Sequence, residues 1–177
     1  MNFEFFDAMS MDEARGFLDA FLKTESATCK HVEVNFRDFT DAKEFSIGSI
    51  SPILRNIIQS LSTFPIDPDD NLPEWIRDLP SYSKGLFEFD EHSKASMLFG
   101  AYYLGESFVR SVPTLSWKIG HPETALKNMP VVGGFRRRLE MGPILVVENV
   151  SNRILADGAD ESVIESTVAE WFSMVVP

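Results

Sequence analysis

Apolar side chains recur every three or four residues in five parts of the chain, which is the spacing of one helix face. Ser10 and Glu13 have the spacing of a capping box at the start of the first part. Ser51-Pro52 places a cap residue before a proline at the first helical position of the second. The pattern predicts helices over 10–24, 51–64, 90–112 with Asp90 as its cap, 143–155, and 160–175 with Asp160 as its cap. The last helix is expected to turn these residues inward: Val163, Ile164, Val168, Trp171, Phe172 and Val175.

The helix predicted over 90–112 is apolar around most of its circumference, so we expect it at the centre of the fold. Its two interior glycines, Gly100 and Gly105, each cost a helix about 1 kcal/mol relative to alanine. Close approach of neighbouring elements would explain both. Glu106 lies inside the same apolar stretch, and a buried carboxylate needs a partner. We expect a buried polar pair of Glu106 with Arg110 one turn later, and an amide of the neighbouring strand is the alternative partner.

Alternation of apolar and polar residues predicts short strands in two places. One covers 31–36, and the other covers 114–119, where Leu115, Trp117 and Ile119 share one face. Residues 129–132, which precede Gly133-Gly134, are expected to return as the second strand of a hairpin.

The order of these elements predicts an α+β fold class. We expect a single domain over 1–177, with four to six helices around a small antiparallel sheet and a single layer of core helices packed on a short hairpin. Residues 65–91, after the close of the second helix at Phe64-Pro65, are expected to form a connector. This connector holds one short helix over Pro73–Leu79 and is long enough to carry a function.

Acidic residues are concentrated in two segments of the chain. Its 177 residues include 16 lysines and arginines and 27 aspartates and glutamates, a formal net charge of −11 at pH 7. Residues 60–92 hold eight acids and two bases (−6), and residues 157–177 hold five acids and no base (−5). This charge opposes binding to nucleic acid or an anionic membrane and favours a basic protein partner, although solubility alone is the alternative. The residues expected to contact the partner are Asp67, Asp69, Asp70, Glu74, Asp78, Glu88 and Glu91.

The sequence lacks the signals of several other classes of protein. It has no run of about 18 apolar residues that would cross a membrane and no basic start of a signal peptide. Cys29 is its single cysteine, which excludes an internal disulfide, so we expect a cytoplasmic protein. The histidines, His31, His92 and His121, are scattered, and Glu88–His92 matches no established metal-ligand spacing. We therefore expect no metal, no cofactor and no catalytic residue.

The basic residues Arg136–Arg138 follow two glycines and form the one basic cluster of the sequence. A solvated turn that pairs with the acidic segments is the expected structure, and a weak anion site is the alternative, because the glycine pattern of a phosphate-binding loop is missing.

Three parts of the sequence resemble small bacterial domains of uncharacterised function of the DUF3806 kind. They are Phe45–Leu54, the stretch Gly100–Glu106 with two tyrosines between its glycines, and Trp117 on a strand. In such domains a helix that ends in a Gly-x-Tyr-x-Gly-Glu-like motif leads into an antiparallel hairpin bearing a tryptophan. The resemblance spans about residues 45–120 and implies a compact α+β architecture with no known catalytic residues. In size, acidity and lack of motifs, the chain is also similar to immunity proteins of bacterial toxin systems.

Two hypotheses of function remain open. The first is an acidic, non-enzymatic protein-binding domain, such as an immunity protein that neutralises a basic bacterial toxin. The second is a small ligand-binding or hydrolytic enzyme with a pocket between the central helix and the Trp117 hairpin. That pocket would use Glu106, Tyr102 or Tyr103, and Arg136–Arg138. A pocket beside Glu106 would favour the second hypothesis, and a packed surrounding would favour the first.

Overall fold

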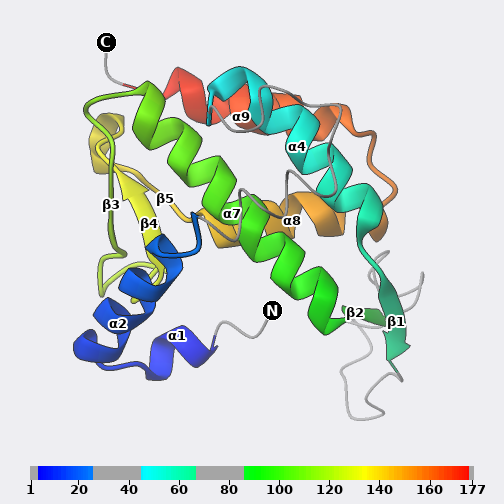
Figure 1. Cartoon of the computed structure of the whole chain (residues 1–177), viewed down its shortest axis with the longest axis horizontal. Coiled ribbons are helices and arrows are strands. Elements are labelled where there is room, and N and C mark those ends of the chain that lie inside the picture. The colour runs from blue at the N-terminus through cyan, green and yellow to red at the C-terminus, as the bar shows by residue number, and fades with distance from the viewer. Residues whose placement is uncertain (1–3, 26–44, 67–85, 176–177) are drawn as a thin grey trace.

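The computed structural model describes residues 4–25, 45–66 and 86–175, and six α-helices and five short strands lie in these ranges (Figure 1). The first half contains α1 (Glu4–Ala8), α2 (Met11–Leu22), α4 (Ile47–Ser60), β1 (Thr63–Ile66) and β2 (Leu86–Phe89). The second half contains α7 (Glu91–Ser111), β3 (Ser116–Ile119), β4 (Pro130–Gly133), a 3₁₀ turn (Arg136–Arg138), β5 (Glu140–Met141), α8 (Pro143–Leu155) and α9 (Ser162–Ser173). The predicted α+β class is confirmed.

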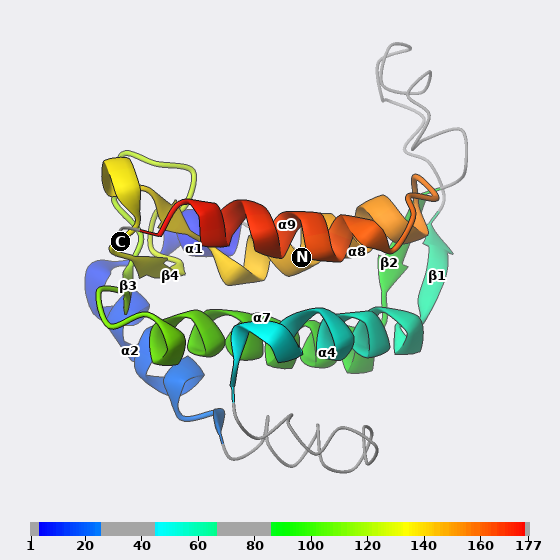
Figure 2. The same ribbon diagram turned by 90° about the horizontal axis from the view of Figure 1, so that it is seen from above.

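The long helices pack in two layers, with α4 and α7 in one and α8 and α9 in the other (Figure 2). The predicted single layer of core helices is therefore wrong. The helix α7 packs against both α4 and α8, which confirms its central position. An apolar surface that covers most of a helix needs neighbours on more than one side, and Ala101, Tyr103 and Phe108 of α7 are completely buried.

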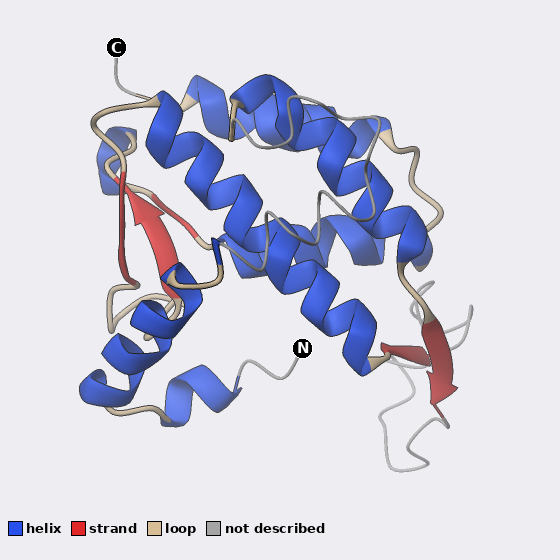
Figure 3. Cartoon of the chain, viewed as in Figure 1, coloured by secondary structure: helices blue, strands red, loops and turns tan. Residues whose placement is uncertain are grey.

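Two antiparallel sheets lie at opposite ends of the helical layers (Figure 3). The three-stranded sheet has the order β3-β4-β5 and pairs Trp117 with Val132, which confirms the predicted hairpin. The strand β5 has two residues, too few to produce an alternating pattern. The two-stranded sheet pairs β1 with β2 and sets Phe64 opposite Glu88. Phe64-Pro65 therefore belongs to a strand, and the prediction that it closes the second helix is wrong, because that helix ends at Ser60.

Two further predictions lie outside the described residues. They are the strand over 31–36 and the short helix over Pro73–Leu79.

Two of the predicted helix caps are confirmed by hydrogen bonds. The Ser10 hydroxyl accepts from the Glu13 amide at 3.3 Å, and the Glu13 carboxylate accepts from the Ser10 amide at 2.8 Å, so both halves of the capping box are present. Asp90 Oδ1 accepts from the Ser93 amide at 2.7 Å at the start of α7. The predicted cap of the last helix at Asp160 is wrong by one residue, because the N-cap of α9 is Glu161, although Asp160 Oδ1 accepts from the Ser162 amide at 2.8 Å.

The start predicted for the second helix at Ser51-Pro52 is wrong. The helix α4 begins at Ile47, so Pro52 lies inside it, and Ser46 with Ser49 forms the capping box. An interior proline loses one backbone hydrogen bond and costs a helix about 3 kcal/mol. The extra turn brings Ile50 into the core, where it is completely buried. Burial of the Ile50 side chain offsets part of the cost of the interior proline. A prediction from local start signals does not include this tertiary contact.

The last helix buries Val163, Ile164 and Val168 as predicted, but Phe172 is 50 % exposed. The prediction that Phe172 faces inward is therefore wrong. Trp171 takes the inward position at this level, and its ring lies 5.2 Å from the ring of the buried Phe135.

The N-terminal helix α1 is attached to the connection before β4. Phe6 is buried, and its ring meets that of Phe17 edge-on at 5.2 Å. The Asn128 side chain, which is also buried, donates hydrogen bonds to the carbonyls of Phe6 at 2.9 Å and Met9 at 2.8 Å. A helix of five residues is marginal by itself, so these contacts account for its formation.

Candidate functional site

Glu106 joins the central helix α7 to the strand β3. Its Oε1 accepts a hydrogen bond from Arg110 Nε at 2.7 Å, and its Oε2 accepts one from the Trp117 indole N–H at 2.9 Å. The Glu106 side chain is 14 % exposed, whereas that of Arg110 is 39 % exposed. The predicted contact one helical turn apart is present, but only the glutamate is largely buried.

Arg110 joins three parts of the chain that are distant in sequence. Besides Glu106, its guanidinium donates to Glu25 Oε1 at 2.5 Å and lies 4.3 Å from the centre of the Phe45 ring. Partial burial lowers the pKa of Arg110, but the hydrogen bonds to Glu106 and Glu25 outweigh this effect, and the pKa stays above its ordinary value. Arg110 therefore holds a fixed positive charge against two carboxylates.

The interface between α7 and Trp117 is tightly packed. A Cβ atom built on Gly105 would lie 2.1 Å from the Trp117 ring, and one on Gly100 would lie 3.2 Å from side-chain atoms of Leu54 and Ile57. Both interior glycines thus have the packing reason that the sequence required. Within the described residues, both Glu106 oxygens are engaged and Trp117 fills the space beside Gly105, so Glu106 has a packed surrounding there.

The first acidic segment is described only in part. Asp67, Asp69, Asp70, Glu74 and Asp78 lie outside the described residues. Glu88 is exposed on β2, and the Glu91 side chain is 90 % exposed and pairs with Lys94 at 2.8 Å. The hydrogen bonds that Asp90 accepts from Ser93 lower the pKa of Asp90, so it stays ionised as the cap of α7.

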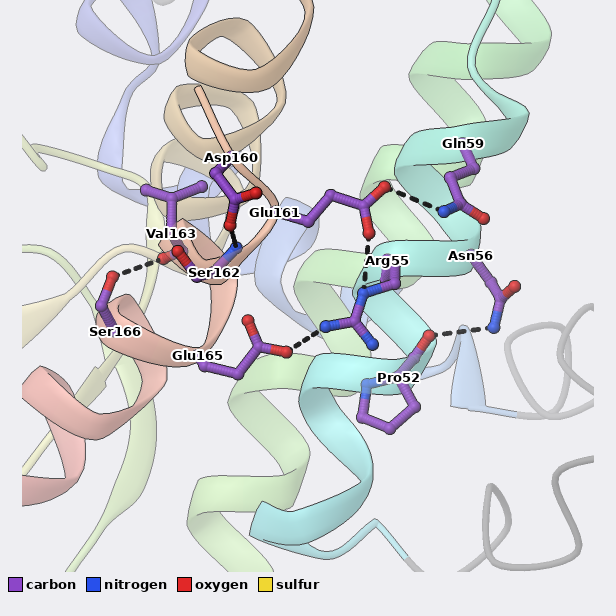
Figure 4. A network of polar contacts seen from close by, with 10 residues as sticks. All are labelled: Pro52, Arg55, Asn56, Gln59, Asp160, Glu161, Ser162, Val163, Glu165 and Ser166. Carbon is purple, nitrogen blue, oxygen red and sulfur yellow. Dashed lines mark hydrogen bonds and ion pairs between the residues drawn. The ribbon is translucent and has the colours of Figure 1, made fainter. Parts of the chain in front are cut away.

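The second acidic segment uses two of its five acids to hold α9 against α4 (Figure 4). The Arg55 guanidinium on α4 lies between Glu161, at 2.9 Å, and Glu165, and Gln59 also donates to Glu161 at 2.9 Å. Sequence reasoning missed Arg55. The available signal was the four-residue spacing of Glu161 and Glu165, which places both on one helix face and allows one arginine to meet both.

Described parts of the two acidic segments lie toward the same end of the molecule. The β1–β2 sheet and the start of α7 lie at the same end as the connection from α8 to α9, although some 70 residues separate them in sequence (Figure 2). We define the acidic end by the described acids that these elements carry there: Glu88, Asp90, Glu91, Asp157 and Asp160. Lys94 and Arg153 are the described bases on the same elements, so the acidic end retains a negative excess.

The basic turn lies at the opposite end, beside the three-stranded sheet (Figure 1). Arg136, Arg137 and Arg138 are exposed, and none of them forms an ion pair with a residue in the described ranges. Pairing of this turn with Glu88, Glu91 or the acids of α9 was expected, and it is absent from these ranges. Next to the turn is a pocket of about 490 Å³ to which Arg138 contributes.

Three other observations concern metal binding, membrane spanning and a further buried carboxylate. No group of three or more histidine, cysteine, aspartate or glutamate side chains that could hold a metal ion occurs within 4–25, 45–66 and 86–175. Over the same ranges, no helix is long and apolar enough to cross a membrane. Glu148 on α8 is another largely buried carboxylate, 6 % exposed. The sequence analysis did not single it out, although it follows directly on the apolar run from Ile144 to Val147.

Comparison of the chain with protein-family models, with curated protein sequences and with solved structures finds no match. The resemblance to domains of the DUF3806 kind stays a prediction.

Proposed function

We propose that this chain is a non-enzymatic binding domain that docks a basic protein partner at its acidic end, in the manner of an immunity protein that neutralises a basic bacterial toxin domain. The observation that supports the proposal is that the described acids of the acidic end come from two segments distant in sequence and lie toward one end of the fold. Charges of one sign gathered on one surface steer an oppositely charged partner and reject partners of like charge.

The carboxylates at and near the acidic end differ in the hydrogen bonds and ion pairs that they form within the fold. Asp90 caps α7, and the carboxylates of Asp90 and Asp160 both accept hydrogen bonds from backbone amides. Glu88 and Asp157 are exposed and have no ion-pair partner in the described ranges. Glu161 and Glu165 are already paired with Arg55, so they contribute less to an outside partner. We expect Glu88 and Asp157 to make the largest contribution among the described acids, and Glu91 to follow, because its side chain is 90 % exposed although it pairs with Lys94.

The proposal also rests on the structural role of Glu106, which was the best candidate in the sequence for acid–base chemistry. Glu106 accepts two hydrogen bonds within the fold and joins α7 to β3, which is a structural role. We further propose that the protein acts in the cytoplasm, in agreement with its single cysteine.

The test is capture of a partner in the cell that makes this protein, with charge variants as baits. The first bait carries Glu88→Gln, Glu91→Gln and Asp157→Asn. The matched control removes three exposed acids on other elements: Asp7→Asn, Asp19→Asn and Glu123→Gln. We expect the unaltered chain and the control to retain one basic protein that salt elutes, and the first bait to lose it. Equal capture by both variants, or a captured protein without a positive net charge, would contradict the proposal.

A toxin as partner gives a second measurement. Co-expression of the chain with the captured protein should restore growth if that protein is toxic, and the acidic-end variant should restore it less well than the control variant. Failure of the unaltered chain to protect would leave the binding proposal standing and remove its immunity role.

A further inference from the structure

The pocket beside the basic turn lies between two stretches that flank the three-stranded sheet. Lys118 on β3 and His121 and Thr124 in the following connection form one wall, and the residues from Arg138 to Glu140 form the other. Its volume of about 490 Å³ falls within the range of roughly 300–1,000 Å³ that small-molecule sites occupy.

Glu140 organises the charges of this pocket. Its carboxylate accepts from Lys118 Nζ at 2.7 Å and from the His121 amide at 3.1 Å, and its side chain is 12 % exposed. Burial raises the pKa of Glu140, but the hydrogen bonds from Lys118 and His121 outweigh it and hold the pKa below its ordinary value. Glu140 is thus a fixed anion that balances Lys118, and it leaves Arg138 as the unbalanced charge of the lining.

The backbone of the turn holds Arg138 in an uncommon conformation. Arg137 and Arg138 have φ angles of 56° and 59°, in the left-handed region that side chains other than glycine rarely adopt. Such residues cost about 1–3 kcal/mol each and cluster at ligand clamps. The turn is anchored, because the Arg136 amide donates to the Met174 carbonyl at 2.9 Å and the Leu139 amide donates to the Arg136 carbonyl at 3.2 Å.

The apolar part of the lining comes from Leu126 and Leu139. Leu126 is held by the backbone around it, since a Cβ atom on Gly120 would lie 1.9 Å from the Leu126 carbonyl oxygen and one on Gly142 would lie 2.7 Å from the Leu126 side chain. Leu139 is 40 % exposed, so its side chain is accessible to a ligand in the pocket.

We propose that this pocket binds a small organic anion with a carboxylate or phosphate group on a short apolar body. The Arg138 guanidinium receives the anionic group, for which its planar fork of donors is suited, and the free donors of Lys118 assist. Leu126 and Leu139 contact the apolar body. This site is separate from the acidic end, and it goes beyond the proposed docking of a protein there.

The net negative charge of the chain does not prevent binding of an anion in this pocket. The pocket and the acidic end lie at opposite ends of the fold (Figure 1), and at physiological salt exposed charges are screened over about 8 Å. A single cationic pocket can therefore attract an anion although the net charge of the chain is −11.

The test is a titration of the full chain with three probes, followed by backbone amide chemical shifts. Hexanoate has both an anionic group and an apolar body, hexylammonium has the same body with the opposite charge, and inorganic phosphate has the charge alone. We expect hexanoate to shift the amides of His121, Thr124 and Leu139 in a saturable way, phosphate to bind more weakly at the same place, and hexylammonium to shift none of them.

Two variants in the same turn decide the role of Arg138. Arg138→Gln should weaken hexanoate binding about tenfold or more, the worth of one charge-assisted hydrogen bond. Arg136→Gln removes the same charge from a residue that does not line the pocket, and it should leave binding within about twofold. An equal loss in both variants, equal binding of hexylammonium, or no saturable shift by hexanoate would overturn the proposal. A retained thermal unfolding midpoint in both variants shows that the loss concerns binding and not folding.

Discussion

At the end of the molecule that carries β3, β4 and β5, the carboxylates of Glu106 and Glu140 are bound into the fold by hydrogen bonds. At the acidic end, Glu88 and Asp157 are exposed and have no ion-pair partner in the described ranges. Glu106, Arg110 and Trp117 fasten the sheet to α7 through hydrogen bonds of 2.7 and 2.9 Å. At the other end, the Ser93 hydroxyl accepts from the Ser62 amide at 2.7 Å and donates to the Ser62 carbonyl at 3.2 Å, so neutral groups hold β1 to α7.

The difference shows where charge contributes to stability and where it is available for binding. A carboxylate with both oxygens engaged and little exposure is costly to change, because its partners lose their acceptor. An exposed carboxylate can be changed at little cost in stability. Variants at the two ends should therefore separate effects on folding from effects on binding.

The largest effect is expected from Gly105→Ala at the sheet end. The added methyl would lie 2.1 Å from the Trp117 ring and 3.1 Å from Pro143, so the helix and the strand must move apart. We expect a loss of about 2–3 kcal/mol in the free energy of unfolding, measured by urea denaturation. Gly16→Ala on α2, where nothing lies within 4 Å, should instead stabilise the chain by up to about 1 kcal/mol. Equal midpoints for the two variants would show that the interface around Trp117 is loose.

The next largest effect is expected from Glu106→Gln. The amide keeps one acceptor for either Trp117 or Arg110 but removes the charge that Arg110 faces, so we expect a loss of about 1–2 kcal/mol. The exposed Glu123 provides a control, since Glu123→Gln should change stability by less than about 0.5 kcal/mol. If Glu106→Gln is as mild as its control, the sheet end is not fastened by this carboxylate, and the contrast between the two ends is lost.

A smaller effect is expected from Arg55→Met between α4 and α9. The ion pairs of Arg55 with Glu161 and Glu165 are between a third and a half exposed, so we expect a loss of at most about 1 kcal/mol. In 1 M salt the loss should shrink, because exposed charges are screened over about 3 Å. Arg15→Met breaks a more exposed pair with Asp12 and serves as the comparison. A loss from Arg55→Met that does not change with salt would point to packing of its stem instead of its charge.

The sequence was most informative where local chemistry alone decides the structure. The capping box of Ser10 and Glu13, the cap at Asp90 and the helix after Pro143 depend on neighbours within one turn, and all three are present. The predicted start of α4 is wrong because the capping box that begins the helix, Ser46 with Ser49, lies one turn before Ser51-Pro52. Ser51-Pro52 is a good local start signal, yet the burial of Ile50 extends the helix toward Ile47.

The residues of the candidate site around Glu106 could be predicted from the sequence, but most of the side chains that they contact could not. The position of Glu106 inside an apolar helix signalled a buried carboxylate, and Arg110 one turn later was the natural partner. Trp117 as second donor, and Glu25 and Phe45 on Arg110, are contacts between segments distant in sequence, which no local pattern contains. The pocket beside Arg138 has the same origin, because its two walls are brought together only by the sheet.

The smallest effect concerns pH and the cap at the acidic end. Hydrogen bonds from the Ser93 amide and hydroxyl lower the pKa of Asp90 below its value of 3.8 in the unfolded chain. Since the folded pKa is the lower one, this stabilisation is fully present above about pH 4 and is lost as the pH falls through the folded value. Asparagine also caps helices but does not titrate, so Asp90→Asn should reduce the drop in the urea midpoint between pH 6 and pH 3.

The exposed Asp7 caps no helix described here, and Asp7→Asn is the control for this measurement. If both variants reduce the acid-induced drop equally, the effect is one of net charge, and the cap at Asp90 is not its source. If only Asp90→Asn reduces it, then the carboxylate of Asp90 is committed to α7, and binding at the acidic end falls to Glu88, Glu91 and Asp157, which make no such bond to a backbone amide within the described ranges.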